Sequence, residues 1–93
     1  MFVLIPTNQF KKDVKALKRR SSKNEKLLID FLAKLEENGA ANIDQKHRPH
    51  KLSGNYENHW EAHIKPDMLI IWFEVNDKNE IILIRAGSHS DLF

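Results

Sequence analysis

The chain has 93 residues, enough for one domain over 1–93 and too few for two independent hydrophobic cores. It contains no cysteine, which excludes a disulfide framework and a thiolate metal site and fits a reducing compartment such as the cytoplasm. The net charge is only +2, but residues 1–51 hold twelve Lys or Arg against six Asp or Glu, whereas residues 52–93 hold three against seven. A basic half attracts polyanions such as nucleic acid, although a solvated helix face is the plainer explanation.

The first half of the chain predicts a short strand followed by a helical hairpin. Residues 1–5 form an apolar run before Pro6 that is typical of a strand and too short for a signal sequence or a membrane span. Thr7 or Asn8 can cap the helix that follows. Its apolar positions recur at helical spacing, and they are Phe10, Val14 and Leu17.

A second amphipathic helix follows after the punctuating stretch "KRRSSKNE", in which Ser21 or Ser22 can act as the cap. Its apolar stripe consists of Leu27, Leu28, Phe31, Leu32 and Leu35. Gly39 marks its end. Residues 40–49 carry no such pattern, so we expect a polar loop there.

Beyond Gly54 the hydrophobic period changes from helical to alternating. Trp60, Ala62 and Ile64 alternate with polar neighbours, which predicts a strand with one buried face. Residues 65–67 then predict a turn, 68–75 a central strand, 76–79 a hairpin turn and 80–86 a last strand. The expected fold is therefore α+β, with an N-terminal strand and a helical hairpin packed on a mostly antiparallel β-sheet.

The stretch "HWEAH" places His59 and His63 four residues apart, as in a helical zinc-protease motif. That motif requires a Glu directly after the first His, whereas Glu61 comes one place late. On a strand the two histidines lie roughly 13 Å apart and cannot share one metal ion. We therefore expect no metal site here.

Five ionisable residues fall at predicted strand ends and turns: His50, His63, Asp67, Arg85 and His89. Asp67 begins the central strand and Arg85 ends its hairpin partner, so both lie at the same end of the sheet. His89 follows within a few residues, and His63 lies across the turn. Any one such histidine is more often a surface or hydrogen-bonded residue than a catalyst, and their common placement is what favours a site.

This set of residue types suits phosphodiester cleavage in RNA without a metal. The reaction needs a base for the ribose 2′-hydroxyl, a cation for the phosphate charge and an acid for the leaving 5′-oxygen. Histidine as a residue type titrates near neutrality and can be base or acid, and arginine stays charged and binds two phosphate oxygens at once.

Three segments in the second half, "HKLSG", "AHIKPDMLIIW" and "RAGSHSDLF", give the chain a specific family resemblance. Their order and spacing resemble those of YafQ-type toxins, a branch of the RelE/ParE superfamily of bacterial toxin–antitoxin systems. The matching region, 50–93, covers nearly half the chain, and the first half matches in its strand and helix pair. The resemblance implies the RelE-like microbial RNase fold.

The resemblance also implies an activity: a cytoplasmic, ribosome-dependent mRNA endonuclease that uses no metal or cofactor. A cognate antitoxin would hold it inactive, and any contact with operator DNA would come through the antitoxin complex. The implied functional set is His50, His63, Asp67, Arg85, His89 and Phe93. Arg85 would hold the scissile phosphate, and His89 and Asp67 would transfer protons. His50 and His63 would orient the RNA or share that transfer, which leaves the identity of the base open. Phe93 would stack on a base or close the sheet as a plug.

The same resemblance suggests that the basic first helix binds ribosomal RNA. Its candidate RNA-binding residues are Lys11, Lys12, Lys15, Lys18, Arg19 and Arg20. Met68 stands where such toxins often carry an aromatic residue, which leaves base preference open, and Trp72 belongs to the strand interior. His47 and His59 have no role in this scheme and are expected at the surface.

Three other functional classes remain possible at this level. A superfamily relative can poison DNA gyrase by binding alone, although a pure binder needs no acid–base cluster. The chain can also be a non-catalytic nucleic-acid or antitoxin-binding module, or a plain structural domain. Growth arrest on expression without an antitoxin separates the toxins from the last of these classes.

Overall fold

A five-stranded sheet in the order β1-β5-β4-β3-β2 organises the computed structural model, which describes every residue from Met1 to Phe93. The strands are β1 (Val3–Pro6), β2 (His50–Lys51), β3 (Trp60–Lys65), β4 (Met68–Val75) and β5 (Glu80–Gly87). β1 runs parallel to β5, and the other neighbouring pairs are antiparallel. The predicted α+β fold with a mostly antiparallel sheet is thus confirmed.

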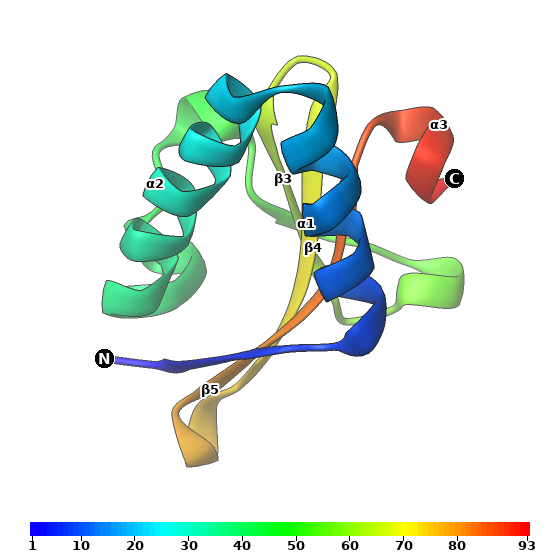
Figure 1. Cartoon of the computed structure of the whole chain (residues 1–93). Helices are drawn as coiled ribbons and strands as arrows, with labels where there is room; N and C mark the ends of the chain where they lie inside the picture. The colour runs from blue at the N-terminus through cyan, green and yellow to red at the C-terminus, as the bar shows by residue number, and fades with distance from the viewer.

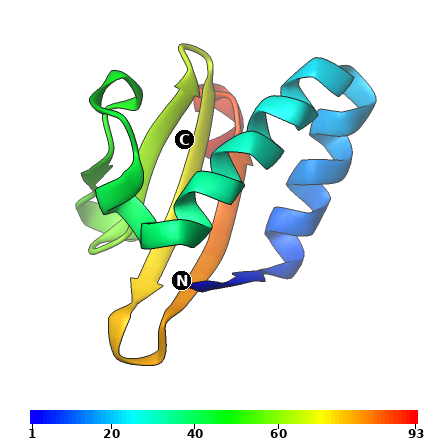
Figure 2. The ribbon, with the colours of Figure 1, turned by 90° about the vertical axis from the view of Figure 1, so that its left-hand side faces the viewer.

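Helices α1 (Asn8–Arg20) and α2 (Ser22–Asn38) form a hairpin on one side of the sheet (Figures 1 and 2). The Thr7 hydroxyl accepts the N–H of Phe10 at 3.1 Å and caps α1. Ser21 ends α1 and caps α2 by accepting the N–H of Asn24 at 3.1 Å. One serine therefore ends the first helix and begins the second, which fixes the turn between them. Neither helix is long and apolar enough to cross a membrane.

The main core lies between the helices and the sheet. Alternate residues of β4, namely Met68, Ile70 and Trp72, face the helices and pack in one cluster with Phe31. The residues between them, including Leu69 and Ile71, pack in a second cluster on the opposite face. Because β4 is buried on both faces, its sequence is almost continuously apolar rather than alternating.

Several boundaries differ from the sequence prediction. The first strand was expected at 1–5 and instead ends at Pro6, which is tolerated because β1 is an edge strand. The expected loop at 40–49 holds the short 3₁₀ helices η1 (Gly39–Asn42) and η2 (Gln45–His47), and Ile43 between them is buried. Two further 3₁₀ turns are η3 (Gly54–Tyr56) and η4 (Asn76–Lys78). β2 and the helix α3 (His89–Leu92) were not predicted, because elements of two and four residues carry no period.

Candidate active site

The face of the sheet turned away from α1 and α2, here called the open face, carries a row of residues that crosses four strands. His50 of β2 pairs with Glu61 of β3, Glu61 pairs with Ile71 of β4, and Ile71 pairs with Arg85 of β5. Partly buried Leu52, Tyr56 and Ile84 pack on this face together with the buried Leu92. The row brings together an imidazole, a carboxylate and a guanidinium that are far apart in sequence.

A β-bulge in β5 turns Arg85 to the open face. Leu83 and Ala86 both pack against the helices although they are three residues apart, which strict alternation forbids. The register shifts between Ile71, which pairs with Arg85, and Trp72, which pairs with Leu83, so Ile84 is the extra residue. Bulges of this kind re-aim side chains beside functional sites.

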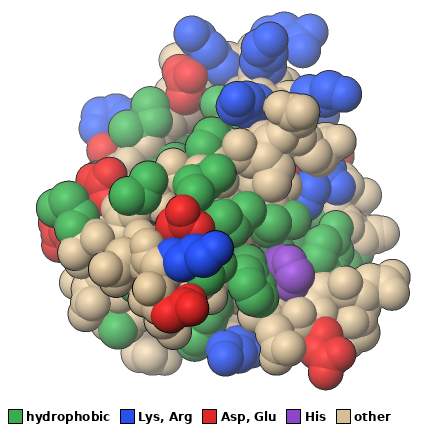
Figure 3. Space-filling model, turned by 90° about the horizontal axis from the view of Figure 1, so that it is seen from below, with side chains coloured by type: hydrophobic (Ala, Val, Ile, Leu, Met, Phe, Trp, Pro, Cys, Tyr) green, Lys and Arg blue, Asp and Glu red, His purple; other side chains and the backbone are tan.

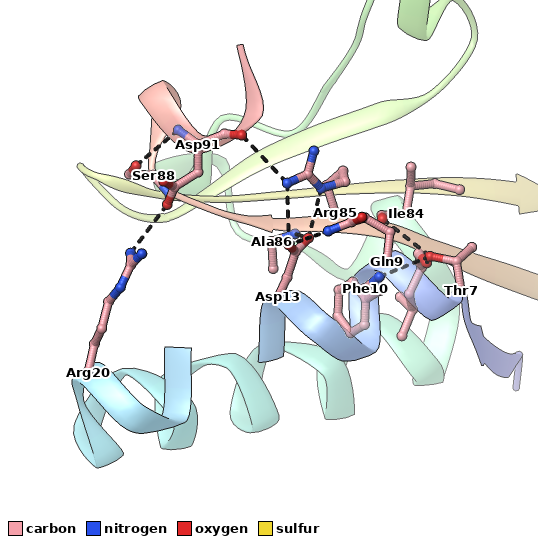
Figure 4. A network of polar contacts seen from close by, with 11 residues as sticks. Thr7, Gln9, Phe10, Asp13, Arg20, Ile84, Arg85, Ala86, Ser88 and Asp91 are labelled. Carbon is pink, nitrogen blue, oxygen red and sulfur yellow. Dashed lines mark hydrogen bonds and ion pairs between the residues drawn. The ribbon is translucent and has the colours of Figure 1, made fainter. Parts of the chain in front are cut away.

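The guanidinium of Arg85 is held by Asp13 of α1 (Figure 4). Arg85 Nε donates to Asp13 Oδ2 at 2.8 Å, and Nη2 donates to Oδ1 at 3.3 Å. The side chains of Arg85 and Asp13 are 22% and 9% exposed. The bond to Asp13 raises the pKa of Arg85 above its ordinary value against the opposing effect of burial, and Tyr56 adds to the rise. Arg85 is therefore a fixed cation at any physiological pH.

His50 is fixed by contacts to both ring nitrogens. Nδ1 lies 2.7 Å from the carbonyl oxygen of Arg48, and Nε2 lies 3.3 Å from Oε1 of Glu61, whose side chain is only 8% exposed. Both partners are hydrogen-bond acceptors, and they hold the ring from two sides. Arg48 itself has a positive φ of 48°, an uncommon backbone conformation for a residue other than glycine.

His89 and Phe93 come from the C-terminal helix α3, which a capping box between Ser88 and Asp91 initiates. Their ring centroids lie 5.0 Å apart, and Phe93 also meets Tyr56 edge-on at 5.9 Å. Leu92 is buried and anchors the helix, whereas Phe93 is 56% exposed. The expected plug role of Phe93 is therefore wrong, since more than half of the residue faces solvent.

His63 and Asp67 lie at the same end of the sheet as Arg85 but are not joined to it. His63 sits between the helix-facing Ala62 and Ile64, so it belongs to the open face, and its buried Nδ1 has no hydrogen-bond partner. Asp67 is exposed in the β3–β4 turn, beside Gly87 and Ser88. No hydrogen bond or ion pair connects either side chain to the other candidates, so their expected clustering extends only to a shared end of the sheet.

The expectation of surface positions for His47 and His59 holds only in part, since both are half-buried. His47 donates from Nδ1 to the carbonyl oxygen of His63 at 2.8 Å and packs edge-on against Phe31. The His59 ring lies 5.1 Å from Phe73. The two rings thus pack the segments before β2 and β3 against Phe31 and Phe73. The composition of these segments does not indicate such contacts.

Met68 is 2% exposed in the core that faces the helices, so it does not lie on the open face. Trp72 is fully buried and donates from Nε1 to Glu74 at 2.8 Å, which confirms its expected place in the strand interior.

All six candidate RNA-binding residues of α1 are exposed. Arg20 differs from the other five because its Nη1 pairs with Oδ2 of Asp91 at 3.4 Å. A view from below shows Lys and Arg side chains crowded along one margin and hydrophobic side chains across the middle of that face (Figure 3).

Three residues near the site were missed by sequence reasoning: Asp13, Tyr56 and Glu61. Asp13 lies three places after Phe10 and four before Leu17, so an acid falls on the apolar stripe of a basic helix, and this was a usable signal. Glu61 was taken as the polar partner in an alternating strand, and nothing local indicated a buried carboxylate. Tyr56 lies in a loop without periodicity. No group of three or more His, Asp or Glu side chains is arranged to hold a metal ion.

Comparison with known proteins supplies a family. The family model described as a bacterial toxin of type II toxin–antitoxin systems, YafQ, matches residues 3–93. The mRNA interferase toxin YafQ of Escherichia coli is 30% identical over 87 residues, which cover 94% of this chain and 90% of that protein. A copper-bound mutant toxin from Helicobacter pylori superposes with a TM-score of 0.85 at 30% identity over 100% of both chains. YafQ in the E. coli DinJ–YafQ complex gives 0.76 at 26% identity, over 100% of this chain and 99% of that one. The resemblance seen in the sequence is confirmed: the chain belongs to the YafQ family of bacterial toxins of type II toxin–antitoxin systems.

Proposed function

We propose that this chain, an mRNA interferase toxin of the YafQ family, cuts messenger RNA in the ribosome by acid–base chemistry that uses no metal ion. The observation that carries the proposal is the row across the open face, with His50 at one end and the fixed Arg85 at the other. An RNA backbone laid along this row meets a permanent cation at Arg85 and the imidazole of His50, a side chain of the type that serves as base or acid.

In the proposed reaction a base removes the proton of the ribose 2′-hydroxyl, whose oxygen attacks the adjacent phosphorus. The bond between phosphorus and the 5′-oxygen breaks, and an acid protonates that oxygen. Arg85 stabilises the negative charge on the phosphate, for which its Nη1 is available because the bonds to Asp13 use Nε and Nη2.

His89 is the first candidate for proton transfer because it is exposed on α3, two residues from Asp91, whose carbonyl oxygen lies 3.5 Å from Arg85 Nη2. Asp67 is assigned to the same task from the β3–β4 turn, where it lies beside Gly87 and Ser88. His50 and His63 orient the RNA or share the transfer, and Phe93 stacks on a base. The partners of His50, Arg48 and Glu61, support its role by fixing its ring.

The exposed basic residues of α1 support action on the ribosome. We assign Lys11, Lys12, Lys15, Lys18, Arg19 and Arg20 to contacts with ribosomal RNA phosphates. Such contacts give affinity without sequence preference, which suits an enzyme that meets its message only inside the ribosome. We therefore propose the cytoplasm as the compartment in which the toxin acts.

As a type II toxin, the chain acts with a cognate antitoxin, as YafQ does with DinJ in the E. coli complex. The basic half offers an acidic or amphipathic antitoxin segment a complementary surface. We assign any contact with operator DNA to that complex rather than to the toxin alone.

Primer extension on a reporter message in a purified translation system tests the function directly. Wild type and His89→Ala are compared with and without ribosomes, after circular dichroism has verified folding. We expect cuts that require ribosomes and that vanish in His89→Ala. Cuts on free message would refute ribosome dependence. Intact message together with broken DNA in arrested cells would instead select gyrase poisoning.

A further inference from the structure

We propose that Asp13 is a positioning residue, which fixes the Arg85 guanidinium in the orientation that receives the scissile phosphate without itself contacting RNA. The inference rests on the proposed function, because that function assigns Arg85 to the phosphate. The two residues are 72 positions apart, and α1 packs along β5 so that they meet.

The contact between the two side chains defines the plane of the guanidinium. Nε donates to Oδ2 at 2.8 Å and Nη2 donates to Oδ1 at 3.3 Å, so the carboxylate binds the Nε–Nη2 edge of the guanidinium. Two parallel bonds fix orientation as well as distance. On the remaining edge, Nη2 also donates to the carbonyl oxygen of Asp91 at 3.5 Å, whereas Nη1 makes none of these bonds and is available for an anion (Figure 4).

Asp13 can impose this orientation because its own carboxylate is largely buried and held by two further hydrogen bonds. Its Oδ2 also accepts the backbone N–H of Ala86 at 3.0 Å, and its Oδ1 accepts the side-chain amide of Gln9 at 3.1 Å. β1 pairs only as far as Leu83, so Asp13 covers the edge of β5 just beyond it. One carboxylate therefore ties the backbone of β5 and the head of Arg85 to the same helix.

A fixed guanidinium has a kinetic advantage over a mobile one. A free Arg side chain populates many rotamers, and this freedom must be removed when it binds a phosphate. A misplacement of about 1 Å in a catalytic group can cost on the order of 100-fold in rate. The Arg20–Asp91 pair offers no such control, because its side chains are 66% and 37% exposed and joined by one bond.

Two other roles for Asp13 make different predictions. If Asp13 only stabilises the edge of β5 through Ala86, its loss should lower stability and leave the rate of cleavage by folded protein unchanged. If Asp13 instead competes with the phosphate for Arg85, its removal should raise the rate. The positioning role predicts a loss of rate that depends on the presence of Arg85.

A double-mutant cycle separates these roles. Asp13→Asn, Arg85→Ala and the double variant are compared with wild type in single-turnover cleavage on saturating ribosomes, well below every melting temperature. Asp30→Asn, which breaks the exposed Lys26–Asp30 pair on α2, is the matched control. We expect Asp13→Asn to slow cleavage roughly 10- to 100-fold with less than about a threefold change in ribosome affinity. In the Arg85→Ala background it should cost less than about twofold more.

An equal loss from Asp13→Asn in both backgrounds, an unchanged rate or a faster one would overturn the positioning role. If Arg85→Ala alone cleaves at the wild-type rate, the assignment of Arg85 to the phosphate fails, and the positioning role fails with it. NMR of the Arg85 Nε–H gives a readout that needs no cleavage. The signal should exchange slowly with solvent in wild type and in Asp30→Asn and rapidly in Asp13→Asn, and slow exchange in Asp13→Asn would also refute the proposal.

Discussion

Replacement of Phe93 tests whether its ring serves RNA rather than the fold. The residue is 56% exposed, so its burial contributes only about half of the roughly 1.5–3 kcal/mol that a fully buried Phe gains. Phe93→Ala should therefore lower the free energy of unfolding by about 1 kcal/mol. Phe31→Ala, at a core position that is 4% exposed, should cost about 3–5 kcal/mol.

The effect on cleavage should be larger than the effect on stability. Stacking of a base on an aromatic ring is worth roughly 1–3 kcal/mol, which corresponds to about 5- to 160-fold in kcat/KM. Phe93→Leu separates stacking from packing, because leucine fills much of the same volume without a flat ring. We expect Phe93→Leu to lose nearly as much activity as Phe93→Ala while it melts close to wild type.

The assay is ribosome-dependent cleavage of a defined message, followed as initial rate against ribosome concentration, with thermal melts on the same preparations. Wild-type activity in Phe93→Leu would refute the stacking role. The stacking role would also be refuted if Phe93→Ala loses cleavage activity only near its melting temperature and regains it when the assay is cooled.

The remaining predictions concern charge. Changing Lys11, Lys15 and Lys18 together to Gln should weaken ribosome binding and reduce the slope of log affinity against log salt by about 0.7–0.9 per lost phosphate contact, and an unchanged slope would exclude these contacts. Backbone and hydroxyl bonds from Ser88, with a smaller effect from Arg20, hold the pKa of Asp91 below its ordinary 3.8. The lowered pKa stabilises the fold above that value and this contribution is lost as the pH falls through the folded pKa, so the stability difference between wild type and Asp91→Asn should shrink in acid. A difference that does not vary with pH in urea melts would contradict this linkage.

The sequence predicted the elements whose signal repeats. Both helices, the cap at Ser21 or its neighbour and the long strands follow from periodicity over eight or more residues or from a strong turn. β2 and α3 were not predicted because they have only two and four residues. β2 is held by its pairing with β3, and α3 by its capping box and by the burial of Leu92. The bulge at Ile84 was not predicted either, because no glycine or proline marks its position in the sequence.

The candidate residues were found more readily than their arrangement. Arg85 and His89 were identified by residue type and family motif, which need no geometry. Asp13 and Glu61 were missed because each is a carboxylate whose role depends on a partner at least eleven residues away, Arg85 and His50 respectively. Sequence distance hides such pairs, and a local pattern cannot distinguish them from solvated surface acids.

The α1 helix joins the two halves of the proposed mechanism. Its exposed side carries the lysines assigned to ribosomal RNA, and its packed side carries Asp13 between the buried Phe10 and Leu17. Because Asp13 binds both the side chain of Arg85 and the backbone of Ala86, the packing of this helix on the sheet sets the position of Arg85, the group that we propose binds the phosphate. If α1 binds the ribosome as proposed, the same helix would connect docking on its exposed side to the alignment of Arg85 on its packed side.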